Sequence, residues 1–131
     1  MAANPAYAAT PKSWAVTTPS TTPDTAIDGT NASTLVTAGA SGSRIEEIRI
    51  MQIKTIASTY IVNLFVHDGS AYHAFDFFSM PANTLSVSVE VEPLVHYYSN
   101  LVIPTSWSVR ASVTVITVGG AFKLTAFGGD F

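Results

Sequence analysis

The chain has 131 residues, of which 47% are hydrophobic and only 11% charged, and its net charge is −3. This length fits one domain with a real core rather than two. The six Lys and Arg residues are scattered, which argues against nucleic-acid binding, and the absence of cysteine excludes disulfides and thiolate metal sites. Because charged residues normally make up about a quarter of a chain, we expect an exterior that is either partly covered by other protein or rich in Ser, Thr and Asn.

Residues 1–25 are predicted to be an extended arm, rich in Ala, Thr, Pro and Ser. Each proline removes a backbone donor and favours extended geometry in the residue before it. The prolines of the arm are Pro5, Pro11, Pro19 and Pro23. Without apolar periodicity, the arm should be disordered alone or extended against something. Trp14 and Val16 are predicted interface residues that anchor it on the domain or on a neighbouring subunit; the alternative is a flexible tail with a chance tryptophan.

The N-terminal residues have neither the positive region nor the apolar stretch of a secretory signal. No apolar run approaches the roughly 18 residues of a membrane span. We therefore expect a soluble protein that is made in the cytoplasm and has no membrane partner.

Short strands follow the arm. Residues 26–29 end in a turn, and Ser33–Thr37 is predicted to be the next strand. The Gly- and Ser-rich residues 38–43 are predicted to form a flexible loop.

The central stretch, residues 44–78, is predicted to form two or three long antiparallel strands joined by tight turns. The first strand runs from Arg44 to Lys54 and the second from Tyr60 to His67. The Asp68-Gly69 pair predicts a hairpin with a type I′ turn, which requires positive φ at both central residues. A third strand then covers residues 71–78.

Side-chain alternation predicts which face of each central strand is buried. In the first strand Ile48 and Ile50 share the core face, whereas Ile45 is out of step and predicts a bulge or a late start of regular pairing. The second strand has one purely apolar face, which we assign to the core. Its residues are Val62, Leu64 and Val66.

The same alternation continues toward the C-terminus. Leu85–Val91 is predicted to be a strand, and 94–101 a more irregular segment. A turn at 103–106 leads into a predicted last hairpin, in which the chain turns at Gly119-Gly120. Its inward side chains are Trp107, Val109, Ala111, Val113 and Val115 on one strand and Phe122, Leu124 and Ala126 on the other.

No 3.6-residue periodicity with capping signals occurs, so helix content should be low. About eight short strands separated by Gly and Pro turns predict an all-β fold, an antiparallel β-sandwich or jelly-roll-like domain. We place this domain at 26–131, with the arm at 1–25 before it.

No pattern of catalytic residues is recognisable, so we expect no enzyme, no cofactor and no catalytic residue. The best metal candidate is a cluster around the hairpin turn, although a polar hairpin end is the preferred interpretation and no metal site is predicted. The cluster consists of His67, Asp68, His73 and Asp76, and the only other histidine is His96.

Other polar and aromatic groups are weaker candidates. The pairs Glu46-Glu47 and Glu90/Glu92 resemble glycosidase carboxylates only in residue type. The aromatic side chains could line a sugar-binding groove, but packing in the core or at an interface is their commoner role. They are Tyr97, Tyr98 and Trp107, and we predict Tyr97 and Tyr98 as interface residues.

Four segments together resemble small structural proteins of tailed-bacteriophage virions. They are Gly42-Ser43-Arg44-Ile45-Glu46-Glu47-Ile48-Arg49-Ile50, Asn63-Leu64-Phe65-Val66-His67-Asp68-Gly69, residues 101–112 (LVIPTSWSVRAS) and Phe127-Gly128-Gly129-Asp130-Phe131. The pattern spans most of the chain after Thr34, and its order and spacing are more specific than any single piece.

The resemblance implies a β-sandwich virion protein, most like head decoration (cement) proteins. Such a protein binds the outer face of the capsid, bridges major capsid protein subunits and stabilises the head. It implies two partners, the major capsid protein and further copies of itself in a homo-oligomer such as a trimer. The arm would add contact area by ordering on a neighbour, and repeated weak contacts would sum over the shell. The alternatives are a tail, neck or fibre position in the virion, or a carbohydrate-binding module.

Overall fold

The structure is a computed structural model, and it describes residues 9–17, 23–29, 31–88, 91–114 and 120–131. Within these ranges the fold is all-β, with eight strands in two four-stranded antiparallel sheets and no helix. The strands are β1 (Thr10–Thr17), β2 (Ser33–Thr37), β3 (Ser43–Gln52), β4 (Tyr60–His67), β5 (Tyr72–Met80), β6 (Leu94–Ile103), β7 (Ser108–Val113) and β8 (Phe122–Asp130).

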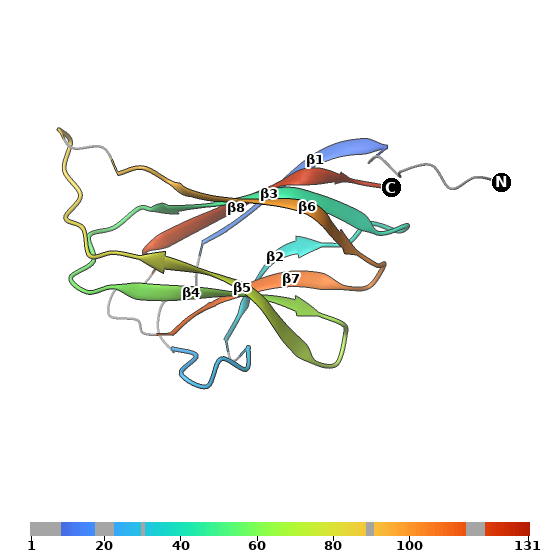
Figure 1. Ribbon diagram of the computed structural model, residues 1–131, viewed down its shortest axis with the longest axis horizontal. Coiled ribbons are helices and arrows are strands. Elements are labelled where there is room, and N and C mark those ends of the chain that lie inside the picture. The colour runs from blue at the N-terminus through green and yellow to red at the C-terminus, as the bar shows by residue number, and fades with distance from the viewer. Residues whose placement is uncertain (1–8, 18–22, 30, 89–90, 115–119) are drawn as a thin grey trace.

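The strand order makes the sandwich a jelly roll. Sheet A has the order β1-β8-β3-β6 and sheet B the order β2-β7-β4-β5. The two sheets form the upper and lower layers of Figure 1, and the chain passes between them at every connection except β4–β5. Eight strands wound in this way between two facing sheets define the jelly-roll architecture. The predicted all-β, jelly-roll-like sandwich is therefore confirmed.

One apolar core fills the space between the sheets, because alternate side chains of each strand point inward. In sheet A, Ile48 and Ile50 of β3 lie beside Ala126 and Leu124 of β8, and all four are fully buried. Sheet B contributes the facing layer, which includes Val62, Leu64, Val109, Ala111 and Val113. Burying each large aliphatic side chain contributes about 1.5–3 kcal/mol, so this shared core holds the two layers together.

Two predicted hairpins are wrong because their strands belong to different sheets. β3 lies in sheet A and β4 in sheet B, and the same separation holds for β8 and β7. Over the described residues, the predicted inward faces of β7 and β8 are correct, but they face each other across the core instead of pairing edge to edge; Val115 lies outside the described residues. Alternation specifies which face is buried, and it is equally compatible with both arrangements.

The β4–β5 hairpin is confirmed, but its predicted two-residue type I′ turn is wrong. The last paired residues are His67 and Tyr72, so four residues, 68–71, form the loop. Gly69 has φ +97°, whereas Asp68 is not among the residues with positive φ. Asp68 instead accepts hydrogen bonds from the backbone of Ser70 and Ala71, which closes a wider turn.

The predicted strand Leu85–Val91 is wrong over its described residues, since 85–88 and 91 belong to no strand and 89–90 lie outside the described residues. Val87 is completely exposed. At its start Leu85 N donates to Thr55 Oγ1 of the loop after β3 (3.0 Å). Just before the segment, Asn83 O accepts from Gln52 Nε2 of β3 (2.8 Å), and Asn83 forms a backbone bridge with Ile56. One hydrogen bond and the adjoining Ile56–Asn83 bridge therefore hold the start of the segment, without a strand ladder over its described residues.

Part of the predicted arm is a strand of the domain. β1 pairs with β8 along its whole length, and the half-buried Trp14 and Val16 pack against the core. Lys12 Nζ adds an ion pair to Asp130 Oδ2 at 3.0 Å. Of the two anchoring partners that the sequence left open, the structure places Trp14 and Val16 on the domain itself. Residues 1–8 and 18–22 of the arm lie outside the described residues.

The bulge predicted near Ile45 is confirmed, and a glycine makes it possible. The register shifts between Ile45 and Glu47 against both neighbouring strands. Gly128 pairs with Ile45 at this point, and a Cβ on it would lie 1.9 Å from the carbonyl oxygen of Arg44. Any side chain at Gly128 would therefore push β8 away from β3, in the middle of sheet A.

Gly128→Ala should lower the free energy of unfolding by at least about 3 kcal/mol, because backbone has to move to relieve the overlap. Urea denaturation of the two proteins measures this. Gly69→Ala is the matched control, since no atom lies within 4 Å of its Cβ position. Positive φ alone should cost the control about 1 kcal/mol. Equal losses in the two variants would contradict the close approach at Gly128.

Candidate functional site

The outer faces of the two sheets differ in what covers them. Sheet B is covered by residues 23–29 of the same chain, which lie below the lower layer in Figure 1. The buried carboxylate of Asp24 accepts hydrogen bonds from Gly29 N (2.9 Å) and from Ser112 Oγ of β7 (2.7 Å). Gly29 lies against the ring of Tyr72, which itself packs edge-on to Phe65. Phe65 is therefore fully buried although it lies outside the core between the sheets.

Sheet A has an outer face without such a cover among the described residues, and we call it the open face. Its side chains include Arg49 and Met51 of β3, which alternate with the buried Ile48 and Ile50. Most of the large apolar side chains that are exposed come from sheet A or from the residue just after β3. These are Met51, Ile53, Leu94, Tyr97, Val102 and Phe127; all except Leu94, which is in register with the buried Ile50, belong to the open face. Apolar surface gathered in this way on one face is typical of a surface that contacts protein.

The charged groups at the centre of the open face pair with each other. Arg49 forms an ion pair with Glu47, and its guanidinium lies 5.7 Å from the ring centre of Phe127. The hydrogen bond to Glu47 raises the pKa of Arg49 above its ordinary value. Glu47 pairs in register with Phe127 on one side and with Tyr97 on the other. The ion pair thus lies between two exposed aromatic rings and adds no net charge.

Two adjoining hollows cross the open face near the start of β6. The larger has a volume of about 520 Å³ and lies between β3 and the segment that precedes β6. The smaller, of about 220 Å³, extends over β8. Met51 and Pro93 line both, so the two hollows form one groove. This groove has the size of a binding site for a side chain or a short segment of a partner.

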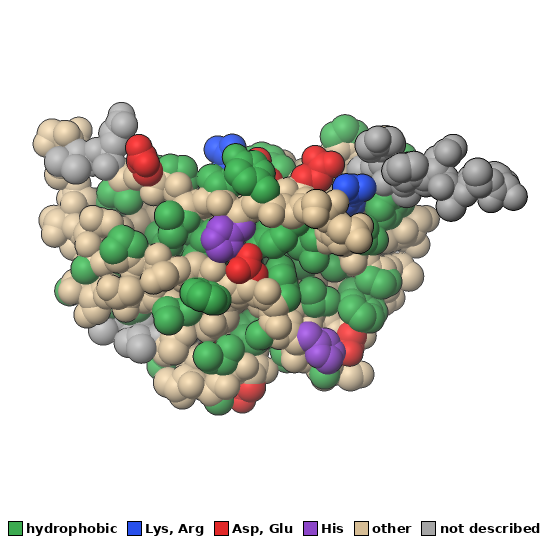
Figure 2. Space-filling view, viewed as in Figure 1, with side chains coloured by type: hydrophobic (Ala, Val, Ile, Leu, Met, Phe, Trp, Pro, Cys, Tyr) green, Lys and Arg blue, Asp and Glu red, His purple; other side chains and the backbone are tan. Residues whose placement is uncertain are grey.

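A second polar cluster joins the two sheets where β5 and β6 are the edge strands. Asp76 Oδ2 of β5 accepts hydrogen bonds from His96 Nδ1 (2.7 Å) and from Tyr98 Oη (2.6 Å) of β6. His96 also stacks on Phe78, with ring centres 4.1 Å apart. Figure 2 looks onto this side of the molecule and shows few charged side chains among hydrophobic and neutral ones. The cluster links the two sheets along their β5 and β6 edges. Asp76 Oδ2 already accepts two hydrogen bonds and is not available to a substrate.

The contacts in this cluster shift the pKa values of Asp76 and Tyr98 in opposite directions. Burial acts to raise the pKa of Asp76, but the hydrogen bonds from Tyr98, His96 and the Phe77 amide outweigh it and lower the pKa below its ordinary value. Burial, and then the hydrogen bond to Asp76, raise the pKa of Tyr98 far above its usual range. The phenol is therefore a fixed donor and not an acid for catalysis.

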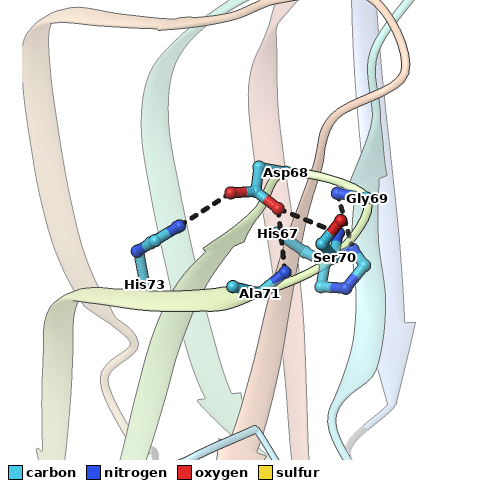
Figure 3. A network of polar contacts seen from close by, with 6 residues as sticks. All are labelled: His67, Asp68, Gly69, Ser70, Ala71 and His73. Atoms are coloured by element: carbon cyan, nitrogen blue, oxygen red, sulfur yellow. Dashed lines mark hydrogen bonds and ion pairs between the residues drawn. The ribbon is translucent and has the colours of Figure 1, made fainter.

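The four residues of the metal candidate at the hairpin turn do not converge on one point. Figure 3 shows Asp68 at the centre of the turn, with His73 Nε2 2.9 Å from Asp68 Oδ2. His67 Nδ1 instead accepts a long hydrogen bond from Gly69 N at 3.3 Å. Asp76 is turned toward β6, as described above. Hydrogen bonds from the Ala71 amide first, and from His73 next, lower the pKa of Asp68 well below its ordinary range. Its oxygens serve the turn, and in the described part of the chain no group of three or more potential ligands could hold a metal ion.

The other predicted residues are distributed over different parts of the sandwich. Of the four predicted interface residues, Tyr97 is 75% exposed on the open face, whereas Tyr98 turns inward to Asp76. Trp14, Val16 and Trp107 are half-buried against the core. Glu90 lies outside the described residues. The residues that sequence reasoning missed are Met51, Ile53 and Phe127, for which the signal was apolar residues on the polar side of an alternating strand.

Comparison with protein families, curated proteins and solved structures finds no match. Within the described residues there is no helix long and apolar enough to cross a membrane.

Asp76→Asn should remove part of the acid sensitivity of the fold. Since the pKa of Asp76 is lowered in the folded state, its carboxylate stabilises the protein above the unfolded value of about 3.9 and loses this effect as the pH falls below it. The wild type should therefore lose more stability than the variant between about pH 5 and pH 3, as urea titrations at each pH will measure. Glu46→Gln, which removes a carboxylate with a 64% exposed side chain, is the control. An unchanged pH profile for Asp76→Asn would show that the contact between the sheets is not ionic.

Proposed function

We propose that this chain is a decoration (cement) protein of a tailed-phage capsid, which binds the outer surface of the shell and bridges major capsid protein subunits. The observation that carries the proposal is the difference between the two sheets. Sheet B is partly covered by its own chain and exposes Ile61 and Phe77, whereas sheet A presents a more extensive apolar face that neighbouring protein would cover.

The fold and the composition add support of a more general kind. Jelly rolls are common in viral capsid domains, although they also occur in lectins and cupins, so the fold alone is an analogy. With 11% charged residues, the chain has few groups that would have to lose water in a protein contact. The resemblance of the four segments to virion proteins points in the same direction.

The proposed role is structural, since the polar clusters of the described residues are occupied in holding the fold. Asp24 fastens the cover of sheet B, Asp68 closes a turn and Asp76 joins the sheets. Asp130 joins β1, β3 and β8 through Lys12 and Ser43. A cement protein needs such rigidity, because many identical weak contacts sum over a shell only when their geometry is fixed.

The test is binding to phage heads that were assembled without this protein. Purified chain should bind saturably and cosediment with the heads, and electron microscopy should show added density on the outer surface between capsid subunits. Val102→Glu places a charge at an exposed position of the open face and should reduce binding at least tenfold. Phe77→Glu, a similar change at an exposed position of sheet B, is the matched control and should bind like the wild type.

Other locations give distinct results in the same experiments. Density at the tail or neck of native particles would favour a tail or adaptor role over the capsid. Binding to a glycan array that disappears in Tyr97→Ala would favour a carbohydrate-binding module. Absence of binding to heads and of density on native particles would contradict the proposal.

A further inference from the structure

Two opposite charges flank Met51 on the open face. Lys123 of β8 is paired in register with Met51 of β3, and Glu92 lines the groove on the other side of Met51, just before β6. Neither Lys123 nor Glu92 forms an ion pair or hydrogen bond among the described residues. A free cation and a free anion thus lie on either side of one exposed apolar side chain.

The two hollows of the groove also differ in the charge of the side chains that line them. The smaller hollow contains the donors Arg49 and Lys123. The larger contains the Glu92 carboxylate and Gln52, whose buried Oε1 has no hydrogen-bond donor among the described residues. The orientation of this amide is fixed, because Nε2 donates to the carbonyl oxygens of Lys54 and Asn83. One end of the groove therefore offers donors and the other offers the Glu92 carboxylate, whereas the buried Gln52 Oε1 is not open to a partner.

We propose that a second copy of this chain covers the groove, and that the two copies are related by a twofold axis running along β3 near Met51. The inference rests on the proposed function in one respect, namely that protein covers the open face. In a twofold interface, if residue i of one copy contacts residue j of the other, then residue j of the first copy contacts residue i of the second. A groove with complementary ends on either side of its centre satisfies this condition.

The strand order determines which residues meet. β8 and β6 lie on opposite sides of β3, so rotation about an axis along β3 brings β8 of one copy over β6 of the other. Lys123 then faces Glu92 of the other copy, and this contact occurs twice. Phe127 faces Tyr97 of the other copy, because both residues are in register with Glu47. Met51 meets its own copy at the centre.

The Glu47–Arg49 pair lies on β3 and so comes close to its own copy. Each pair is internally neutral, and Arg49 also lies over the ring of Phe127. The two copies therefore bring together two neutral ion pairs, whose repulsion is weaker than that of two isolated like charges. In the twofold pair the two open faces cover each other, so contacts with capsid subunits would come from the surfaces that point outward. Val102→Glu would then weaken head binding by breaking the pair and its avidity.

The mass of the purified full-length chain, measured by sedimentation equilibrium over a range of concentrations, tests the proposal. We expect twice the chain mass at high concentration. Lys123→Glu and Glu92→Lys should each raise the dimer Kd about tenfold, because each change creates two like-charge contacts. The double variant should return to within about threefold of the wild type. Rising salt should weaken the wild-type dimer and the double variant alike.

Controls keep this test independent of folding and of capsid binding. Met51→Glu should abolish the dimer, whereas Phe77→Glu on sheet B should leave the Kd unchanged; circular dichroism and thermal melting check that all variants fold. A monomer at every concentration, a trimer, or a double variant weaker than either single variant would overturn the proposed interface. None of these results depends on binding to heads, so the proposed function can fail or hold separately.

Discussion

A β-sheet has two faces, and the core of a sandwich covers only one of them. The surface properties of this protein depend on whether its own chain covers the outer face of each sheet. In sheet B, residues 23–29 return over the outside and bury Phe65 beneath Tyr72. In sheet A the corresponding positions carry Met51, Tyr97 and Phe127, which stay exposed in the single chain. The chain thus covers much of the outer face of sheet B, although Ile61 and Phe77 stay exposed there, and leaves the outer face of sheet A without a cover among the described residues.

The polar side chains follow this division. Those on sheet B and at the edges have partners within the chain: Asp24 with Ser112, and Asp76 with His96 and Tyr98. On the open face Glu47 pairs with Arg49, and Arg44 contacts Glu46 and donates to Ser99 O, while the Lys123 and Glu92 side chains are left without partners among the described residues. A buried polar group without a partner is expensive, whereas an exposed one can wait for a partner in water. This explains why, in the described part of the chain, the charged side chains without a partner lie where the surface is open.

Local patterns were sufficient for the elements but not for their assembly. The bounds of β2 and β4 agree with those expected from alternation and turn residues, and the bulge after Ile45 follows from one residue out of step. Alternation cannot tell whether consecutive strands pair or face each other, so β3 and β4 were expected to form a hairpin. It also suggested a strand at Leu85–Val91, although the described part of this segment belongs to no strand and is held at its start by a hydrogen bond from Leu85 N to Thr55 Oγ1.

The candidate site was predictable only in part, for the same reason. Tyr97 was expected at an interface and does lie on the open face, but its neighbour Tyr98 turns inward to an aspartate 22 residues away in sequence. No local signal connects Asp76 with β6, because the packing of one sheet against the other brings them together. Trp14 and Val16 were chosen for their apolar character, which in β1 serves the core.

The pairing of β1 with β8 has a practical consequence for labelling. Thr10 is in register with Asp130, whereas Lys123 and Met51 lie at the opposite end of the same strands. Seven residues of extended chain separate these two ends, which corresponds to about 23 Å. The C-terminus, marked in Figure 1, emerges beside the start of β1. A fluorescent tag joined to Phe131 would therefore project from the far end of the sheet and leave the groove accessible, so that particles could be imaged with the tagged protein in place.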